Sequence, residues 1–131
     1  MANEAVLMFE THPAIPLTVA DGAGIEKGTL LKLSDPMTVA ATSADNDIFA
    51  GVAAEEKVAS DGRTKLAVYT GGVFRVKDSG SGVTVGDTVV VKGANLVGTH
   101  TTLDQEKGYK VGRALETAAA SETFLCYINL I

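Results

Sequence analysis

The chain has 131 residues, the length of one domain, and its 46% apolar content suffices for a core and excludes wholesale disorder. Its formal net charge is −5 and its Lys and Arg residues are scattered, which argues against nucleic acid as a partner. No stretch approaches the roughly 18 apolar residues of a membrane span, so we expect no membrane partner.

The N-terminal segment, residues 1–24, differs from the rest of the chain. An apolar run at residues 5–9 is followed by Pro13 and Pro16, which bias their preceding residues toward extended conformations. The Asp-Gly-Ala-Gly sequence at 21–24 then ends any regular element. We therefore expect an extended N-terminal arm. It either forms a first strand on the chain's own core or adds a strand to the exposed sheet edge of a partner.

Residues 25–131 predict a single β-rich domain, because short apolar runs alternate with turn residues at the spacing of small all-β folds. The expected strands are 29–33, 37–41, 48–56, 65–70, 73–77, 88–92, 95–99, 109–116 and 123–131. The run at 88–92 is typical of a strand that is buried on both sides. This pattern predicts a mainly β fold, a compact small β-barrel or β-sandwich.

Two local features refine this prediction. Asp61-Gly62 supplies the positive φ that a hairpin turn requires, between the strands at 48–56 and 65–70. Residues 115–120 are the only helix-favouring stretch, and an isolated stretch this short is marginal. We expect one short helix at most.

The residues that could carry chemistry form no catalytic pattern. His12 and His100 are the only histidines, and no Ser or Asp near them suggests a proton relay. Cys126 is the only cysteine, so no disulfide forms within the chain, and its place on the apolar face of the last strand predicts an inert, buried thiol. We predict no catalytic residues and no enzyme activity.

Metal and cofactor motifs are equally weak. Asp45-Asn46-Asp47 with Glu56 matches part of a calcium loop, but Phe49 and Ala50 occupy the positions of an oxygen ligand and the turn glycine. The glycine-rich residues 80–86 precede a β-branched run and not a helix, so they predict a turn rather than a phosphate loop. We expect no metal and no cofactor.

Two other classes of function stay open as alternatives. Small carrier barrels of the biotinyl or lipoyl type also use Gly-Asp-x-Val turns, and they present a lysine at a hairpin tip. Lys57 and Lys65 flank Asp61-Gly62, although neither lies at the tip. A small β-barrel binding or carrier module is therefore the second hypothesis. A small hydrolase is the third, and it would need a pocket joining a histidine to a carboxylate and a hydroxyl.

Five short segments occur together in a distinctive order: 25–30 (Ile-Glu-Lys-Gly-Thr-Leu), 49–53 (Phe-Ala-Gly-Val-Ala), 72–74 (Gly-Val-Phe), 85–89 (Val-Gly-Asp-Thr-Val) and 111–115 (Val-Gly-Arg-Ala-Leu). In this order they resemble the capsid cement (head decoration) proteins of tailed bacteriophages and related viruses, over roughly residues 22–131. The resemblance implies a compact β-rich fold and no enzymatic activity. It also implies a homotrimer on the outer face of the capsid, at its local threefold axes, with the major capsid protein as partner.

The resemblance further implies that the N-terminal arm contacts the shell. The expected contact residues are Ala5, Val6, Leu7, Met8, Phe9 and His12. Such a protein is made in the host cytoplasm, is carried on the outer surface of the virion, and stabilises the shell by bridging capsomers. A trimer that engages equivalent sites gains avidity, because its later contacts are effectively intramolecular.

Overall fold

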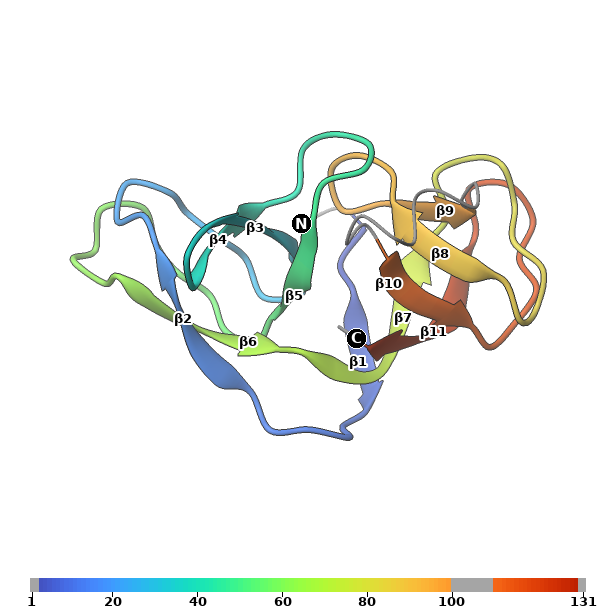
Figure 1. Cartoon of the computed structure of the whole chain (residues 1–131), viewed down its shortest axis with the longest axis horizontal. Helices are drawn as coiled ribbons and strands as arrows, with labels where there is room; N and C mark the ends of the chain where they lie inside the picture. The colour runs from blue at the N-terminus through green and yellow to red at the C-terminus, as the bar shows by residue number, and fades with distance from the viewer. Residues whose placement is uncertain (1–2, 100–109, 130–131) are drawn as a thin grey trace.

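The computed structural model describes residues 3–99 and 110–129, and these residues form eleven strands and no helix (Figure 1). In chain order the strands are β1 (Val6–Phe9), β2 (Ile15–Val19), β3 (Leu30–Asp35), β4 (Thr38–Ala41), β5 (Phe49–Ala53), β6 (Lys65–Tyr69), β7 (Gly71–Lys77), β8 (Thr88–Val91), β9 (Val97–Thr99), β10 (Lys110–Ala114) and β11 (Thr123–Asn129). The predicted mainly β fold is confirmed. No helix among the described residues could cross a membrane.

Five strands close into a barrel in the order β2-β4-β3-β5-β6, on the left of Figure 1. Its interior is filled by alternate residues of each strand, as the period-two pattern of β6 predicts. Leu66 and Val68 are fully buried there, while Lys65, the first residue of β6, is exposed. The barrel therefore has its own apolar core, to which Leu17, Val19 and Leu31 also belong.

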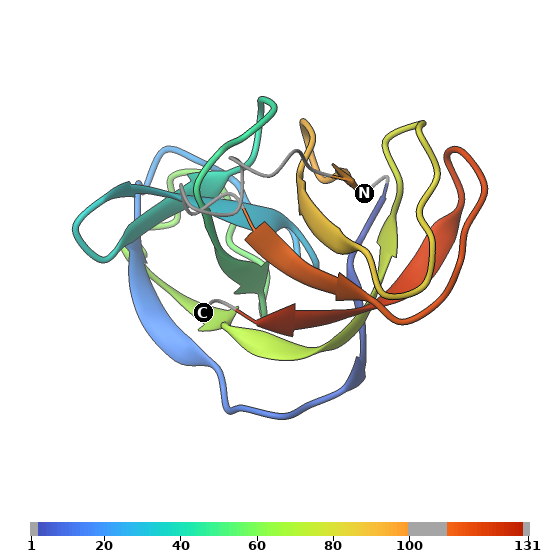
Figure 2. The same cartoon turned by 45° about the vertical axis from the view of Figure 1, so that its right-hand side comes forward.

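The other six strands form an open sheet in the order β1-β7-β11-β10-β8-β9 (Figure 2). One face of this sheet is buried, and β11 shows it most clearly, since Phe124, Cys126 and Ile128 are fully buried and alternate with half-exposed residues. Val89, Val90 and Val91 of β8 are all fully buried, which confirms the prediction that this strand is covered on both sides.

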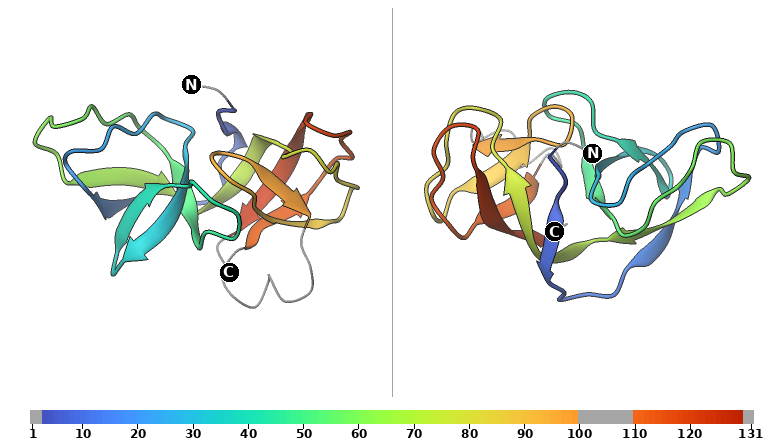
Figure 3. Two further views of the ribbon diagram at one scale, coloured as in Figure 1. Left: turned by 90° about the horizontal axis from the view of Figure 1, so that it is seen from above. Right: turned by 180° about the vertical axis from the view of Figure 1, so that it is seen from behind.

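The barrel and the sheet lie side by side and share a wall, as the view from above shows (Figure 3). Every residue of β5 is buried. Phe49 and Val52 belong to the core under the sheet, whereas Ala50 and Ala53 belong to the core of the barrel. Only Thr70 separates β6 from β7, so the chain also passes directly from one sheet into the other.

Two glycines of the family-like segments stand where strands approach too closely for a side chain. Gly51 has φ +141°, and a Cβ there would overlap the carbonyl oxygen of Tyr69 on the neighbouring strand β6. A Cβ on Gly112 would overlap the carbonyl oxygen of Tyr127 on β11. Both glycines are therefore required by packing of backbone on backbone.

The structure divides the N-terminal part of the chain differently from the predicted arm of residues 1–24. β1 pairs antiparallel with β7, and β2 is a barrel strand paired with β4 and β6. The reason is apolar periodicity: Leu17 and Val19 alternate into the barrel core, so β2 cannot leave it without exposing them. Residues 15–24 thus belong to the body of the domain.

A buried polar side chain fastens this N-terminal part to the rest. The side-chain amide of Asn95 donates to the carbonyl oxygens of Asn3 at 2.7 Å and Gly28 at 3.2 Å, and its oxygen accepts from the N–H of Leu30. The N–H of Asn95 donates to the hydroxyl of Thr42. Asn95 therefore joins the turn between β8 and β9 to the N-terminus and to the barrel.

The helix-favouring stretch at 115–120 is not helical. Ala118 instead exchanges both of its backbone hydrogen bonds with Val83, each at 3.0 Å, in an isolated β-bridge. Tertiary pairing outweighs the weak helix propensity of this short segment.

Candidate functional site

The expected contact residues of the arm fall on and beside β1, at one edge of the open sheet. Among the described strands β1 pairs only with β7, and the view from behind in Figure 3 shows it beside that strand. Its outer backbone edge has no partner strand in the described part of the chain. An edge of this kind can accept a strand from another protein.

The side chains of these residues divide into two groups. Ala5 is buried and Leu7 packs against the core, so both hold β1 onto its own sheet. Val6 and Met8 are each 44% exposed and Phe9 is 64% exposed, which is high for large apolar residues. Of the expected contact residues in β1, these three remain available to a partner.

His12 is also exposed, in the connection between β1 and β2. Its Nδ1 lies 2.9 Å from the hydroxyl of Thr11, and its ring packs over Gly71, where an added Cβ would lie 2.7 Å from Nδ1. His100 lies outside the described residues. The structure therefore places His12 as a surface residue beside β1.

A second exposed apolar surface lies on the barrel, and sequence reasoning did not find it. Ile15, Leu33, Met37 and Ile48 are exposed and line a groove of about 350 Å³ that contains no charged side chain. The residues come from β2, from β3 and the turn that follows it, and from the approach to β5. No sequence period marks them as one surface, because only the barrel brings them together.

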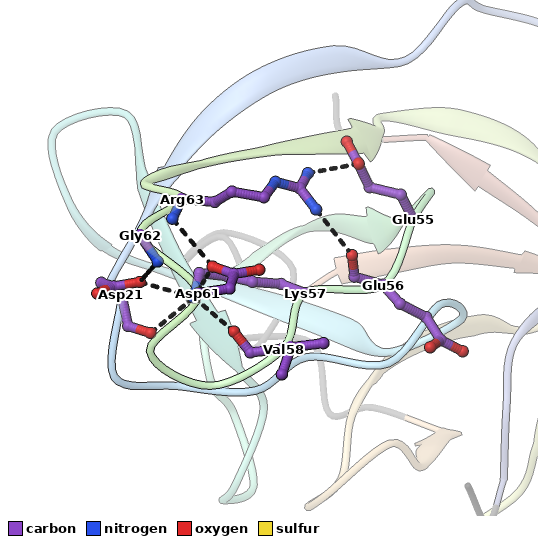
Figure 4. Close-up of polar contacts among 8 residues, drawn as sticks. All are labelled: Asp21, Glu55, Glu56, Lys57, Val58, Asp61, Gly62 and Arg63. Atoms are coloured by element: carbon purple, nitrogen blue, oxygen red, sulfur yellow. Dashed lines mark hydrogen bonds and ion pairs between the residues drawn. The ribbon is translucent and has the colours of Figure 1, made fainter.

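Lys57, in the loop between β5 and β6, has a fully buried side chain (Figure 4). Its Nζ donates to the carbonyl oxygens of Asp21 at 2.6 Å and Val58 at 3.2 Å. It also forms ion pairs with the carboxylates of Asp21 at 3.4 Å and Asp61 at 3.2 Å. Lys57 thereby ties the loop after β2 to the loop before β6.

A second ion pair supports the same loop. Arg63 pairs with the carboxylate of Glu55 and donates to the carbonyl oxygen of Glu56 at 3.0 Å (Figure 4). The N–H of Ala67 and the Arg63 side chain together lower the pKa of the Glu55 carboxyl. The N–H of Arg63 likewise lowers the pKa of Asp61. These contacts shape the loop, and Glu55 and Arg63 also line a hollow of about 390 Å³ beside it.

The geometry around the lysines bears on the carrier alternative. A carrier lysine must reach a modifying enzyme, but Lys57 is enclosed and fully hydrogen-bonded. Lys65 is exposed, yet it lies within β6 and donates to the Thr18 hydroxyl at 3.0 Å. Neither lysine stands at the tip of a hairpin.

The loops considered for metal or phosphate are held by their own backbone. The Asp47 carboxylate accepts the N–H groups of Ser43 and Ala44, at 2.8 and 3.0 Å, and lies 3.7 Å from Lys32. Burial raises the pKa of the Asp47 carboxyl, but these contacts outweigh burial, and the pKa is lowered. Asp78, which sequence reasoning missed, accepts the N–H groups of Gly80 and Gly82 and so organises the glycine-rich turn. No cluster that could hold a metal ion occurs in residues 3–99 and 110–129.

Cys126 is enclosed in the core under the open sheet, and burial raises the pKa of its thiol to about 12. Because the thiolate is the reactive form, we expect Ellman's reagent to leave the folded protein unlabelled and to label it fully in denaturant. Absorbance at neutral pH with and without urea measures this. Rapid labelling of the folded protein would contradict the burial of this side chain.

Three comparisons with known proteins complete this description. A family model described as phage cement protein matches residues 9–130. No curated protein matches the chain. Among solved structures, the head fiber gp8.5 N base of bacteriophage phi29 is similar with a TM-score of 0.56 and 18% identity, over 89% of this chain and 93% of that one. At this level of identity the likeness shows a shared fold.

Proposed function

The chain belongs to the phage cement protein family, and on that premise we propose that it decorates the outer surface of the capsid as a trimer at local threefold axes. The family has a capsid-associated structural role. In the proposed arrangement each copy contacts the major capsid protein and bridges neighbouring capsomers, and this stabilises the shell. The protein is made in the host cytoplasm before it joins the particle. The family match over residues 9–130 is the observation that carries the proposal.

A protein that stabilises a capsid needs a large contact area and several points of attachment, and it needs no catalytic residues. A trimer seated on equivalent sites gains avidity because its second and third contacts form at high effective concentration. The net charge of −5 helps many crowded copies to stay soluble before they bind.

We place the contact with the shell at β1. An added strand would hydrogen-bond to the outer edge of β1, and Val6, Met8 and Phe9 would supply apolar anchors. His12 lies beside them in the connection to β2. Ala5 and Leu7 act indirectly, since they anchor β1 on the chain's own core.

The attachment is tested by the double substitution Met8→Ala/Phe9→Ala. Both side chains are exposed, so stability should stay unchanged. Burial of each in an interface is worth about 1.5–3 kcal/mol, and we expect affinity for the shell to fall by at least about a hundredfold. Co-sedimentation with purified shells that lack the protein measures this.

The matched control is Val58→Ala/Val85→Ala, which shortens apolar side chains that are 68% and 59% exposed elsewhere on the surface. It should bind like the unmodified chain. Deleting residues 1–11 is a cruder test, because it also removes Ala5 and Leu7 from the core and the Asn3 bond to Asn95. Unchanged binding by the Met8/Phe9 variant would exclude β1 as the attachment site.

The trimer is tested separately by stoichiometry. Shells saturated with the protein should carry copies in multiples of three for each local threefold axis. Quantitative gel densitometry against the major capsid protein gives the ratio. A saturating ratio of one copy per axis would contradict the trimer while leaving the capsid-associated role in place.

A further inference from the structure

The solvent-facing side of the open sheet gathers positive charge in a chain whose net charge is −5. On β7 the half-exposed residues Arg75 and Lys77 alternate with the buried Phe74 and Val76. On β10 the exposed Arg113 stands on the same side, because it is paired with Tyr127 of β11, which in turn is paired with Val73. Side chains of directly paired residues share one face of a sheet.

These charges adjoin the apolar residues of β1. The pairing register places Val6 opposite Arg75 and Phe9 opposite Val73. A single cross-strand row therefore runs from Phe9 through Val73 and Tyr127 to Arg113. The exposed apolar edge and the cations thus belong to one continuous sheet face.

The row ends in a hollow of about 370 Å³. Its described lining includes Lys110 and Arg113 of β10 and Tyr127 and Asn129 of β11, with Leu115 at its side, and no acidic residue is among these described residues. Within the described part of the chain neither Lys110 nor Arg113 forms an ion pair. Guanidinium and ammonium groups beside a phenol and an amide offer several donors to a carboxylate.

Two acidic side chains of the described residues, Glu116 and Glu122, already have partners. The Glu116 carboxylate accepts the N–H of Leu125 at 2.9 Å and lies 3.6 Å from the Arg75 guanidinium. The Glu122 carboxylate accepts the N–H of Ala119 within its own turn. Neither acid is among the residues that line the hollow, so its positive charge stays uncompensated by them.

We propose that this hollow binds carboxylate side chains of an acidic segment of the capsid protein, beside the contact made by β1. The inference rests on the proposed function and adds the chemistry of the partner. Charge complementarity selects the occupant: a cationic hollow without acids in its lining attracts a segment rich in Asp and Glu. Attachment then has an apolar part at β1 and a salt-sensitive part at β10 and β11.

The test compares three chains in co-sedimentation with shells that lack the protein: the unmodified chain, Lys110→Glu/Arg113→Glu, and the control Lys32→Glu/Lys65→Glu. The control makes the same change in net charge at two barrel lysines that line neither the hollow nor the pocket beside β1. We expect the hollow variant to lose about tenfold or more in affinity, and the control to lose little. Raising the salt concentration should lower the affinity of the unmodified chain for shells until it approaches the affinity of the hollow variant.

A second measurement uses an oligoglutamate peptide as the probe. In NMR titrations it should shift the amide signals of Lys110, Arg113 and Tyr127 in the unmodified chain, and an oligolysine peptide should not. Circular dichroism confirms that each variant is folded.

The outcomes separate the two proposals. If the unmodified chain binds no shells, the proposed function fails, and this inference fails with it. If the hollow variant binds shells as tightly as the control, only the acidic partner is excluded. If the hollow variant instead loses self-association in analytical ultracentrifugation and keeps its affinity for shells, the occupant is a second copy of the chain and the inference is overturned.

Discussion

Replacing Lys57 by alanine should lower the free energy of unfolding by about 3–5 kcal/mol. The side chain is fully buried and its ammonium group satisfies the carbonyl oxygens of Asp21 and Val58 as well as two carboxylates. Its removal leaves those carbonyl groups without their donor and opens a cavity along the aliphatic stem. Urea denaturation followed by circular dichroism gives the difference.

The matched control is Lys65→Ala, since Lys65 is an exposed lysine of β6 whose ammonium group bonds only the Thr18 hydroxyl among the described residues. Its loss should change stability by about 0.5 kcal/mol or less. Equal effects of the two substitutions would mean that the burial of Lys57 contributes nothing to the fold.

Replacing Gly112 by alanine should cost on the order of 4 kcal/mol or prevent folding altogether. The added methyl group would overlap the Tyr127 carbonyl group and crowd the Cα of Ile128, so β10 and β11 would have to separate. These strands carry the central hydrogen bonds of the open sheet and the residues of the proposed cationic hollow. Thermal unfolding and soluble yield report the effect.

Gly22→Ala is the control for this substitution, because a Cβ there meets no atom within 4 Å. It should leave the melting temperature nearly unchanged. A Gly112→Ala variant as stable as the Gly22→Ala variant would show that the two strands can move apart at little cost.

The strands could be predicted because their sequence periods match their surroundings. β6 and β11 alternate buried and outward residues, and the three consecutive valines of β8 are all buried. Turn residues bound each strand, so the predicted and observed limits agree within a few residues. The sequence does not contain the strand order, and so the parallel pairing of β2 with β4 was not predicted, and the barrel was predicted only as one of two alternatives, the other being a sandwich.

The N-terminal arm shows where the same reasoning stops. Its apolar residues alone do not say which of them face the chain's own core, and the pairing of β1 with β7 decides that Ala5 and Leu7 do. The burial of Lys57 was not predicted, and nothing in its local sequence marks it, because lysines are seldom buried. Its burial depends on Asp21, which is distant in sequence.

The two candidate sites, the exposed part of β1 and the cationic hollow, also differ in how well the sequence predicts them. The exposed part of β1 could be located from an apolar run followed by prolines. The cationic hollow could not, because Lys110 and Arg113 meet Tyr127 and Asn129 only through the pairing of β10 with β11. Charges that are scattered along the chain become a surface only when the strand order is known.

In the proposed attachment to a capsid, the strand β5 has a mechanical consequence. Because the side chains of β5 fill both cores, the barrel and the sheet cannot be pulled apart without exposing apolar residues of both cores. A force applied to the barrel or to the open sheet is therefore transmitted to the other. When the shell expands, the contact between the protein and the capsid should therefore break before the protein unfolds.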